Sequence, residues 1–442
     1  MDIVVVGGGM AGARLAHRLG QPHALPGPHA LAGAPGGRTD GDRIHVTLVA
    51  EEPHRPYNRV LLAEVLAGRL RPEQVALPAP GRLVSARAVR LDRDERLLHC
   101  DDGSVLSWDR LVLATGANPV LPPLRGLFRP GDHDLPAGVH AFRTMDDCLA
   151  LSAAVRPGVR AVVVGGGLLG VSAAQALAAR GAQVVVAQQG EHLMDRHLDA
   201  QAAALLHTHL TAQGVEVHTS CRVRGVLTAD DGPARTVRAV ELADGYRLDA
   251  DLVVLACGVR PRVGLAEAAG IAVAKGVVVD DQLRTSDPAV FAAGDCAQHA
   301  GTVYGLAGAA RDQADVLAQV LAAEALGTRE APLAGPRYTG TRALTRLTLT
   351  PARPPVAGTA PGPALDLAAF GEVSPLPGDD VLHLTDATRG SYRKVVVRGD
   401  RLAGGVLLGD LAAVGAVARA WEGDEPLPSA PLIHLLTDDG GF

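Results

Sequence analysis

The stretch Asp2-Ile-Val-Val-Val6-Gly7-Gly8-Gly9-Met10-Ala11-Gly12 decides the fold that we expect for this chain. Its apolar half predicts a short buried strand, its glycines predict a tight turn, and residues 13–19 predict a helix. Gly7 permits the sharp turn, Gly9 lets the backbone approach a pyrophosphate, and Gly12 lets the helix pack on the strand. The helix N-terminus would then face a diphosphate. One such match is also compatible with a glycine-rich turn that binds nothing.

The same pattern returns in the middle of the chain. Ala161-Val-Val-Val164 leads into Gly165-Gly-Gly-Leu-Leu-Gly170, followed by a helical stretch at 171–180 and a strand at 183–186. An internal repeat of one nucleotide-binding pattern arises by accident much less readily than a single copy. The repeat therefore predicts two dinucleotide sites.

The strand that follows each glycine turn ends at a residue suited to bind ribose. The first strand is Ile44–Val49, and Glu51 lies just beyond it, where a carboxylate can accept from two vicinal hydroxyls. An exposed loop glutamate is the alternative. Residues 21–43 are rich in Pro, Gly and Ala and predict an inserted loop, so position at the strand end counts more than spacing from the glycines. In the second copy the residue is Gln188, which can hydrogen-bond to ribose without clearly excluding a 2′-phosphate.

Size and composition limit the classes of protein that fit. The chain has 442 residues, enough for two or three domains, and its net charge of -6 gives no reason to expect a nucleic-acid partner. No apolar run approaches the length of a membrane span, and the N-terminus begins with a strand instead of a signal-peptide pattern. We expect a cytoplasmic protein with no membrane partner.

The cysteines and histidines do not form a recognisable metal or redox motif. The five cysteines lie far apart in sequence, without a CxxC pair, which argues against a redox dithiol, a zinc site and an iron–sulphur motif. Buried or inert thiols are the simpler interpretation. No HExxH pattern occurs, so we predict no metal and name no catalytic residue.

Other elements complete the expected organisation. Residues 98–106 predict a hairpin, and the strand at 110–113 leads into Ala114, Thr115 and Gly116. Later strands end in Gly258 and Gly294, and an Ala-rich helix is expected at 305–326. After a linker at 329–336, strand-like residues at 339–350, a hairpin at 392–408 and a helix at 411–421 predict a small α+β unit.

Taken in order, these motifs resemble the FAD-dependent pyridine nucleotide-disulphide oxidoreductase superfamily over roughly residues 1–325. The resemblance rests on both glycine fingerprints, Ala114-Thr115-Gly116 and Phe291-Ala-Ala-Gly294-Asp295. Residues 56–64, 114–123 and 192–199 are more closely similar to the flavin module of bacterial NAD(P)H nitrite reductase large subunits and of stand-alone flavoproteins of assimilatory nitrate reduction. Residues 392–410 are similar to the C-terminal domain of that group.

The resemblance implies an α/β fold with two Rossmann-like domains and a small C-terminal α+β domain. The FAD domain would comprise residues 1–120 and 256–328, the NAD(P) domain 121–255, and the C-terminal domain 336–442. The implied FAD contacts are Gly7, Gly9, Met10, Ala11, Gly12, Glu51, Arg59, Ala114, Thr115, Gly116, Gly294 and Asp295. The implied NAD(P) contacts are Gly165, Gly167, Leu168, Leu169, Gly170, Gln188 and Gly258.

Two of these roles have structural alternatives. Arg59 would lie against the FAD adenine or diphosphate, where a guanidinium can both stack and pair with phosphate, but it could be a surface arginine. Asp295 would contact the ribityl or pyrophosphate region of FAD, but it could simply cap a helix.

The chain also departs from its relatives. Ferredoxin and rubredoxin reductases of this layout have a lysine near the flavin where this chain has Glu64, and a carboxylate there would repel negative charge unless it pairs elsewhere. Many relatives carry a glutamate at the position of Ser172. The disulphide-reductase branches require a cysteine within about residues 40–66, and none is present.

The resemblance implies an enzyme that oxidises NADH or NADPH through FAD and reduces a separate redox partner, a nitrate or nitrite reductase component. A ferredoxin or rubredoxin reductase is one alternative. A flavin-binding subunit with a decayed nicotinamide site is another, suggested by Ser172 and Gln188. A homodimer is implied by resemblance alone, and the preference for NADH or NADPH stays open.

Overall fold

The computed structural model describes residues 1–21, 44–78, 81–131, 134–231, 234–327, 335–342, 344–351, 364–386, 388–427, 431 and 433–436. Within them the chain forms two compact units. Unit 1 contains residues 1–60, 72–118 and 260–341, and unit 2 contains residues 61–71, 119–259 and 342–442. The predicted inserted loop at 21–43 falls almost wholly outside the described residues. The short elements η1 (Arg59–Leu61), β8 (Ala117–Pro119) and β17 (Val259–Pro261) contain three of the points where the chain passes from one unit to the other.

Unit 1 is built on a five-stranded parallel sheet in the order β19-β7-β1-β2-β3. The β-branched run of β1 occupies the centre, where residues 3–6 are buried on both faces. Counted from β1, the order 3-2-1-4-5 is that of a dinucleotide-binding fold. The strands are β1 (Asp2–Val6), β2 (His45–Ala50), β3 (Arg82–Ser85), β7 (Arg110–Leu113) and β19 (Val290–Ala292).

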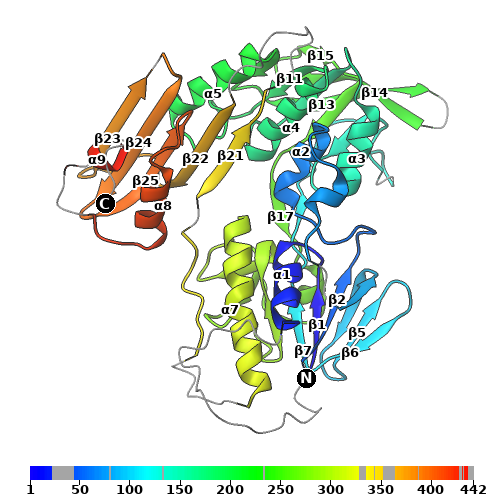
Figure 1. Cartoon of the computed structure of the whole chain (residues 1–442). Helices are drawn as coiled ribbons and strands as arrows, with labels where there is room; N and C mark the ends of the chain where they lie inside the picture. The colour runs from blue at the N-terminus through cyan, green and yellow to red at the C-terminus, as the bar shows by residue number, and fades with distance from the viewer. Residues whose placement is uncertain are drawn as a thin grey trace. The chain divides into compact units, whose positions relative to one another are not determined.

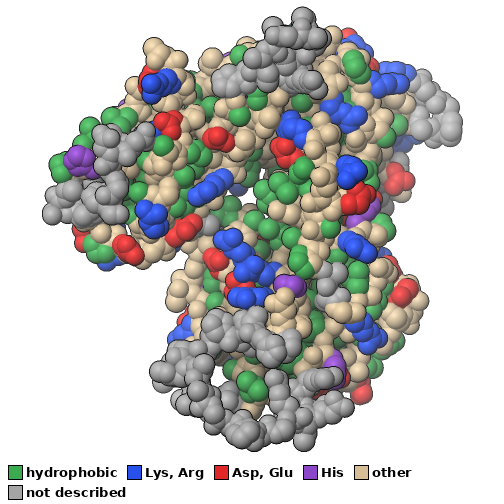
Figure 2. Space-filling view, in the orientation of Figure 1, with side chains coloured by type: hydrophobic (Ala, Val, Ile, Leu, Met, Phe, Trp, Pro, Cys, Tyr) green, Lys and Arg blue, Asp and Glu red, His purple; other side chains and the backbone are tan. Residues whose placement is uncertain are grey.

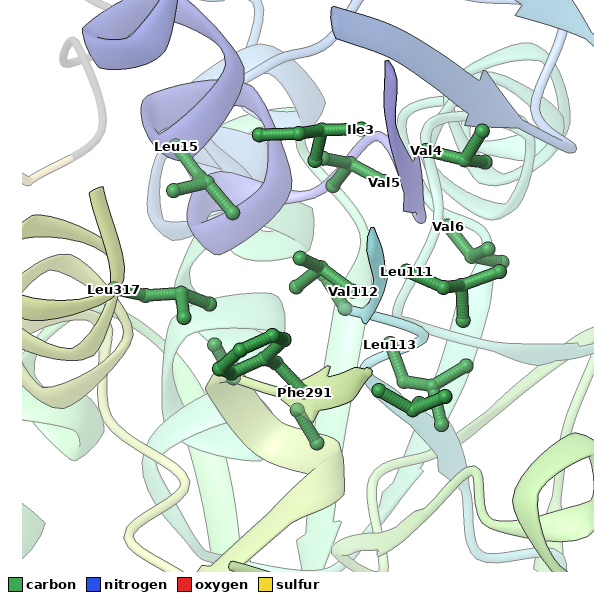
Figure 3. Packing of buried hydrophobic residues seen from close by; sticks show 14 of the residues in the cluster. Ile3, Val4, Val5, Val6, Leu15, Leu111, Val112, Leu113, Phe291 and Leu317 are labelled. Carbon is green, nitrogen blue, oxygen red and sulfur yellow. The ribbon is translucent and has the colours of Figure 1, made fainter. Parts of the chain in front are cut away.

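Two helices, α1 and α7, pack side by side against this sheet (Figure 1). Leu15 of α1 and Leu317 of α7 point toward the sheet (Figure 3) and belong to its buried core. Arg14 of α1 donates to both carboxylate oxygens of Asp315 on α7, at 2.7 and 2.6 Å, which fixes the two helices together. The remaining elements of unit 1 are α1 (Met10–Leu19), η2 (Pro72–Val75), β4 (Ala88–Asp92), β5 (Leu97–Cys100), β6 (Val105–Ser107), α6 (Gly264–Ala268), β18 (Val277–Val279), η3 (Gly294–Cys296), β20 (Ala297–His299) and α7 (Ala307–Ala325).

The predicted hairpin at 98–106 is confirmed, because β5 and β6 pair antiparallel with Leu98 opposite Leu106. The predicted strand at 339–350 is shorter than expected. Only β21 (Thr345–Leu349) is a strand, while Tyr338 is 2% exposed in the core of unit 1. Its ring contacts those of His299 and Tyr304, with centroids 4.9 and 5.7 Å away. This buried anchor draws the chain onto unit 1 and prevents strand pairing there.

Unit 2 repeats the architecture with a second parallel sheet, in the order β12-β11-β10-β16-β9. An antiparallel sheet, β13-β14-β15, shares its hydrophobic core. The elements are α2 (Leu62–Leu66), β9 (Val139–Ala141), α3 (Met145–Ala154), β10 (Arg160–Val164), α4 (Leu168–Ala179), β11 (Gln183–Ala187), α5 (Ala200–Ala212), β12 (Val215–His218), β13 (Val223–Asp231), β14 (Ala234–Leu242), β15 (Arg247–Asp249) and β16 (Leu252–Leu255).

The C-terminal part of unit 2 is a five-stranded antiparallel sheet in the order β21-β22-β25-β24-β23. Helix α8 packs on it, as Figure 1 shows, and contributes Val417 to a separate core. The predicted hairpin at 392–408 is confirmed, with Tyr392 opposite Leu408. The elements are β22 (Leu365–Gly371), β23 (Asp380–Asp386), β24 (Ser391–Arg398), β25 (Arg401–Leu408), α8 (Val414–Glu422) and α9 (Ile433–Leu436).

A nearly buried ion pair joins this antiparallel sheet to α5. Asp199 caps α5 through Ala202 N–H at 3.0 Å, and its other oxygen accepts from Tyr392 at 2.6 Å and from Lys394 at 2.7 Å. Burial acts to raise the pKa of Asp199, but the hydrogen bonds from Lys394 and Tyr392 outweigh it and lower the pKa. The charged carboxylate is therefore the form that holds the two parts of unit 2 together.

Asp199→Asn is expected to lower the stability of unit 2 by about 2 kcal/mol, because the cap survives while the Lys394 ammonium loses its charged partner. Since the folded-state pKa of Asp199 is depressed, its contribution is present above the unfolded value of about 3.9 and disappears as pH falls through the lower folded value. Urea denaturation at about pH 7 and about pH 3 measures the difference. A Lys394→Met variant completes the double-mutant cycle, and additive effects would contradict the coupling.

Charged side chains of both signs are intermingled on the face that Figure 2 shows. Opposite charges also pair locally within unit 2, where Arg160 of β10 meets Asp249 at 2.9 Å and Asp251 at 2.8 Å. The hydrogen bond from Arg160 lowers the pKa of Asp251 to about 2. The small net charge of -6 therefore reflects mixed charges on this surface.

Candidate dinucleotide sites

The two predicted glycine turns have nearly the same conformation. Gly7 has a φ of +121° and Gly165 a φ of +108°, in the region that side chains of L-residues rarely adopt. A Cβ atom at Gly7 would lie 2.1 Å from the carbonyl oxygen of Ala114, and one at Gly165 would lie 2.5 Å from that of Ala256. Each turn therefore requires glycine twice over, for its dihedral angle and for its close approach to the next strand.

The third glycine of each fingerprint sets the distance between helix and turn. A Cβ atom at Gly12 would lie 2.0 Å from the oxygen of Gly7, and one at Gly170 would lie 1.8 Å from the oxygen of Gly165. Backbone atoms cannot move aside to relieve such a clash, as the end of a flexible side chain can. The first turns of α1 and α4 are thus held directly on the glycine turns.

The middle glycines leave the two helix N-termini open. Gly9 and Gly167 are the N-cap residues of α1 and α4, with φ/ψ of -76°/-172° and -77°/-174°, and neither helix has a side-chain cap. Thr144 caps α3 and Asp199 caps α5, while α7 and α8 also begin without a side-chain cap. The first N–H groups of a helix need acceptors, and an anionic ligand supplies them where the chain does not. Among the described residues, a Cβ at Gly167 would meet no atom within 4 Å, and one at Gly9 would meet only Arg59 Nε, at 3.9 Å.

The predicted contacts of the first site converge from distant parts of the sequence. Gly294, in η3, comes so near α1 that a Cβ there would lie 3.0 Å from the Cβ of Ala11. Ala114 and Thr115 adjoin Gly7 at the end of β7. Met10, the first residue of α1, and Asp295, in η3, belong to these same elements. Gly116 has a φ of +73° but no such close approach.

A glutamine that the sequence analysis did not name supports this arrangement. Gln313, 1% exposed on α7, accepts a hydrogen bond from Gly294 N–H at 2.7 Å. A buried amide oxygen on an apolar helix needs such a partner. It thereby sets the backbone conformation at the start of η3. A glutamine in this Ala-rich helix is visible in the sequence, but its partner is not.

Arg59 lies beside the N-terminus of α1, close to Gly9. Its guanidinium pairs with Glu52, lies over the ring of Tyr57 at 5.1 Å, and reaches the neighbourhood of Gly9. Tyr57 donates to the other oxygen of Glu52 at 2.6 Å. Glu52 therefore orients Arg59 toward the open helix end, a role that sequence analysis missed because it favoured the neighbouring Glu51. The position of Arg59 agrees with the predicted contact to a diphosphate.

Arg59→Met is expected to weaken FAD binding by about ten-fold to a hundred-fold, because a charge-assisted hydrogen bond to phosphate is lost. Titration of the apoprotein with FAD, followed by flavin fluorescence, measures the dissociation constant. Glu52→Gln is the matched control: it keeps the guanidinium but loosens its orientation, so a smaller loss is expected. An unchanged constant in Arg59→Met would assign this residue to the surface.

Glu51, the predicted ribose ligand of the first site, follows the last residue of β2. Its carboxylate pairs with Arg262, whose guanidinium also contacts Asn118, and the Arg262 backbone is held by Thr115 and Gly116. The carboxylate remains one-third exposed, at 34%. The contact of Glu51 with ribose stays a prediction, and Arg262 is the partner that sequence analysis could not supply.

In the second site, Leu168 and Leu169 begin α4, and Gly258 follows β16 with a φ of +94°. Gln188 is buried at the end of β11, where its side-chain oxygen accepts from Gly166 N–H at 2.8 Å. The hydroxyl of Ser172 donates to the Leu168 oxygen at 2.7 Å, within its own helix. The predicted contacts of this site with NAD(P) stay predictions.

Glu64, which replaces the lysine of related reductases, pairs with a neighbour. Arg69 donates to both of its oxygens, at 2.5 and 2.9 Å. A carboxylate near a reduced flavin would need such a cationic partner to reduce its repulsion of negative charge. The ion pair lies within unit 2 and removes the electrostatic objection to Glu64.

All five cysteines are free thiols. Cys100, Cys148 and Cys296 are buried, and burial raises the pKa of Cys148 to about 11. Burial is also the main cause that raises the pKa of Cys257. Thiols with raised pKa values are poor nucleophiles at neutral pH, as predicted for these cysteines.

Comparison with known families now identifies the class. The model of the family described as pyridine nucleotide-disulphide oxidoreductase matches residues 1–314, and that described as rubredoxin NAD+ reductase C-terminal domain matches residues 364–422. The chain belongs to the pyridine nucleotide-disulphide oxidoreductase family. Members of this family use FAD and NAD(P)H.

Two relatives show which proteins of known name the chain is similar to. The chain is 30% identical to the nitrite reductase [NAD(P)H] of Bacillus subtilis (strain 168), over 92% of this chain and 46% of that protein. It is also 30% identical to the assimilatory nitrate reductase electron transfer subunit of the same organism, over 83% of this chain and 44% of that protein. The chain thus spans less than half the length of either relative.

A solved structure, the covalent complex of putidaredoxin reductase with putidaredoxin, shares the fold with a TM-score of 0.77. It is 22% identical, and the match covers 98% of both chains. The predicted fold class, α/β with two Rossmann-like domains and a small C-terminal α+β domain, is confirmed. The residue boundaries predicted for the three domains stay predictions.

In the described parts of the chain, no group of three or more His, Cys, Asp and Glu side chains is placed to hold a metal ion. No helix there combines the length and the apolar character needed to cross a bilayer.

Proposed function

We propose that this chain binds FAD at the first fingerprint and NADH or NADPH at the second, and delivers the electrons to a separate redox protein of nitrate or nitrite reduction. The observation that carries the proposal is the pair of matching glycine turns, one in each unit, each followed by a helix without a side-chain cap. A dinucleotide diphosphate supplies the acceptors that these N–H groups lack.

The residues around the first turn fit FAD. Arg59 offers a guanidinium beside Gly9, and η3 brings Gly294 against α1. FAD, when bound, accepts a hydride from the nicotinamide and releases its two electrons onward. The side chains around the two glycine turns have only to bind and align the two dinucleotides, because hydride transfer between the dinucleotides requires no acid or base from the protein. This agrees with the absence of a predicted catalytic residue.

The proposed acceptor rests on relatives. Residues 56–64 and 192–199 resemble nitrite reductase flavin modules, and the relatives described above carry out nitrite reduction or electron transfer to nitrate reductase by their names. The five scattered cysteines provide no iron–sulphur motif of this chain's own. A separate protein is therefore proposed to hold the terminal redox centre.

Anaerobic reduction of the purified yellow protein tests the first half of the proposal. NADH or NADPH is expected to bleach the flavin absorbance, and addition of a nitrate reductase catalytic component is expected to restore it. If neither nicotinamide bleaches the flavin, or changes its fluorescence in a saturable way, the chain is a flavin-binding subunit and the proposal is wrong.

A ferredoxin or rubredoxin reductase is the second candidate, favoured by the match of residues 364–422 to the rubredoxin NAD+ reductase C-terminal domain. Rapid cytochrome c reduction that depends on added ferredoxin or rubredoxin would support it. Homodimer formation, on the resemblance alone, and a place in the cytoplasm, on the sequence pattern described above, complete the proposal.

A further inference from the structure

The amide of Gln188, at the end of β11, is already engaged with the protein through both of its polar atoms. Its oxygen accepts from Gly166 N–H at 2.8 Å, and its nitrogen donates to the His192 oxygen at 3.2 Å and to Asp195 Oδ2 at 3.5 Å. Both donor hydrogens of the amide are thus directed at acceptors, and the side chain is 9% exposed. A strand-end residue engaged in this way fixes the glycine turn and has little capacity left for the two hydroxyls of a ribose.

The loop after β11 brings a carboxylate to the same place. Leu193 and Met194, each 1% exposed, hold the loop against the glycine turn, and Met194 N–H donates to the Gly166 oxygen at 2.8 Å. Met194 has a left-handed φ of +53°, which reverses the chain immediately before Asp195. Asp195 is exposed, and its Oδ2 would lie 2.4 Å from a Cβ at Gly190. A buried pair of apolar residues therefore presents an exposed carboxylate at the strand end.

We propose that Asp195 binds the adenosine ribose hydroxyls of the nicotinamide dinucleotide and that the chain consequently prefers NADH to NADPH. The inference rests on the proposed nicotinamide site at the second fingerprint. A carboxylate accepts hydrogen bonds from both hydroxyls of a ribose, as the strand-end acid does in other dinucleotide-binding folds. A 2′-phosphate would place a second anion against the same carboxylate, which disfavours NADPH. Gln188 is then the positioning residue that holds Asp195 and the turn together.

The loop that carries Asp195 also holds other charged and titratable side chains. Arg196 is exposed beside Asp195 and is the cation that could attract a 2′-phosphate. Burial, with a smaller contribution from Arg196, lowers the pKa of His197, so this ring is neutral at physiological pH and adds no positive charge. The exposed charges of the loop at 189–197 are therefore two carboxylates, Glu191 and Asp195, and the guanidinium of Arg196, and Asp195 is the carboxylate that contacts Gln188.

The test uses the flavin-loaded full chain and compares the rates at which NADH and NADPH, at subsaturating concentrations, bleach the flavin without oxygen. The wild type is expected to react faster with NADH. Asp195→Asn is expected to reduce the NADH:NADPH ratio by about ten-fold to a hundred-fold, the loss of hydrogen bonds to a charged group. Asp195→Glu is expected to retain part of the preference, and Arg196→Gln is the matched control for removal of an exposed charge.

A variant at position 188 separates this inference from the ordinary assignment. Gln188→Glu places a second carboxylate near Asp195 and removes both amide donors, so the NADH rate is expected to fall. If residue 188 itself bound the ribose, the same change would raise the NADH rate. Flavin content and the thermal unfolding curve verify that each variant is folded.

The outcomes are distinct. An unchanged NADH:NADPH ratio in Asp195→Asn, a gain with NADH in Gln188→Glu, or a wild-type preference for NADPH that Arg196→Gln abolishes would each overturn the inference while the proposed function stands. Failure of both nicotinamides to bleach the wild-type flavin would overturn both together.

Discussion

Gly12→Ala is expected to yield a protein that retains roughly a tenth or less of the wild-type FAD. The new methyl group would lie 2.0 Å from the backbone oxygen of Gly7, so α1 must move away from the turn. Because α1 is also fixed to α7 by the Arg14–Asp315 ion pair, this movement strains the core of unit 1 and is expected to cost about 3 kcal/mol or more. Flavin absorbance per chain and the urea unfolding midpoint measure the two effects.

Gly170→Ala provides the matched comparison, because its clash with the Gly165 oxygen, at 1.8 Å, lies in unit 2. It is expected to impair the response to nicotinamide while unit 1 keeps its flavin. Normal flavin content in Gly12→Ala would contradict the geometry of the first turn.

Gly9→Ala and Gly167→Ala are expected to separate the two ligands without unfolding either unit. Both glycines have an extended backbone conformation, with φ near -76°, that alanine also adopts. A Cβ at either position has no atom closer than 3.9 Å. Stability should therefore fall by only about 1 kcal/mol, the cost of replacing glycine by alanine at an N-cap position. Each Cβ would instead occupy the space that a diphosphate needs, which is expected to weaken binding by about a hundred-fold.

The two variants are expected to have opposite phenotypes. Gly9→Ala should raise the dissociation constant of FAD, measured by titration of the apoprotein. Gly167→Ala should retain FAD and slow flavin bleaching at low nicotinamide concentration. The same defect in both variants, or none, would show that the two turns do not bind separate dinucleotides.

Local chemistry made much of the fold predictable. A run of β-branched residues, a glycine turn and a helix occur in order at 2–19 and again at 161–180, and the type of each element follows from its own residues. The hairpin at 98–106 was equally predictable from the sequence, because a turn of Asp and Gly separates two apolar segments. The strands of the two fingerprints still obtain their hydrogen-bonding partners from other segments, which are β2 and β7 for β1 and β11 and β16 for β10.

Partners brought in by the tertiary structure were not predictable. Gln313 meets Gly294, and Arg262 meets Glu51, across gaps of 19 and 211 residues that no sequence period connects. The place of Gln188 at the strand end predicts a ribose ligand, and that contact stays a prediction. The hydrogen bonds that occupy its amide depend on the left-handed turn at Met194, which carries no sequence pattern.

Tyr338 has a consequence for how such reductases can be recombined. Its ring lies in the core of unit 1 beside His299, and its N–H donates to the Asp281 oxygen at 2.7 Å, although it follows the expected linker at 329–336. A chimera joined within that linker would exchange a piece of the flavin-side core along with the C-terminal module. The natural crossover point for grafting another C-terminal domain therefore lies after Thr341, where unit 1 ends.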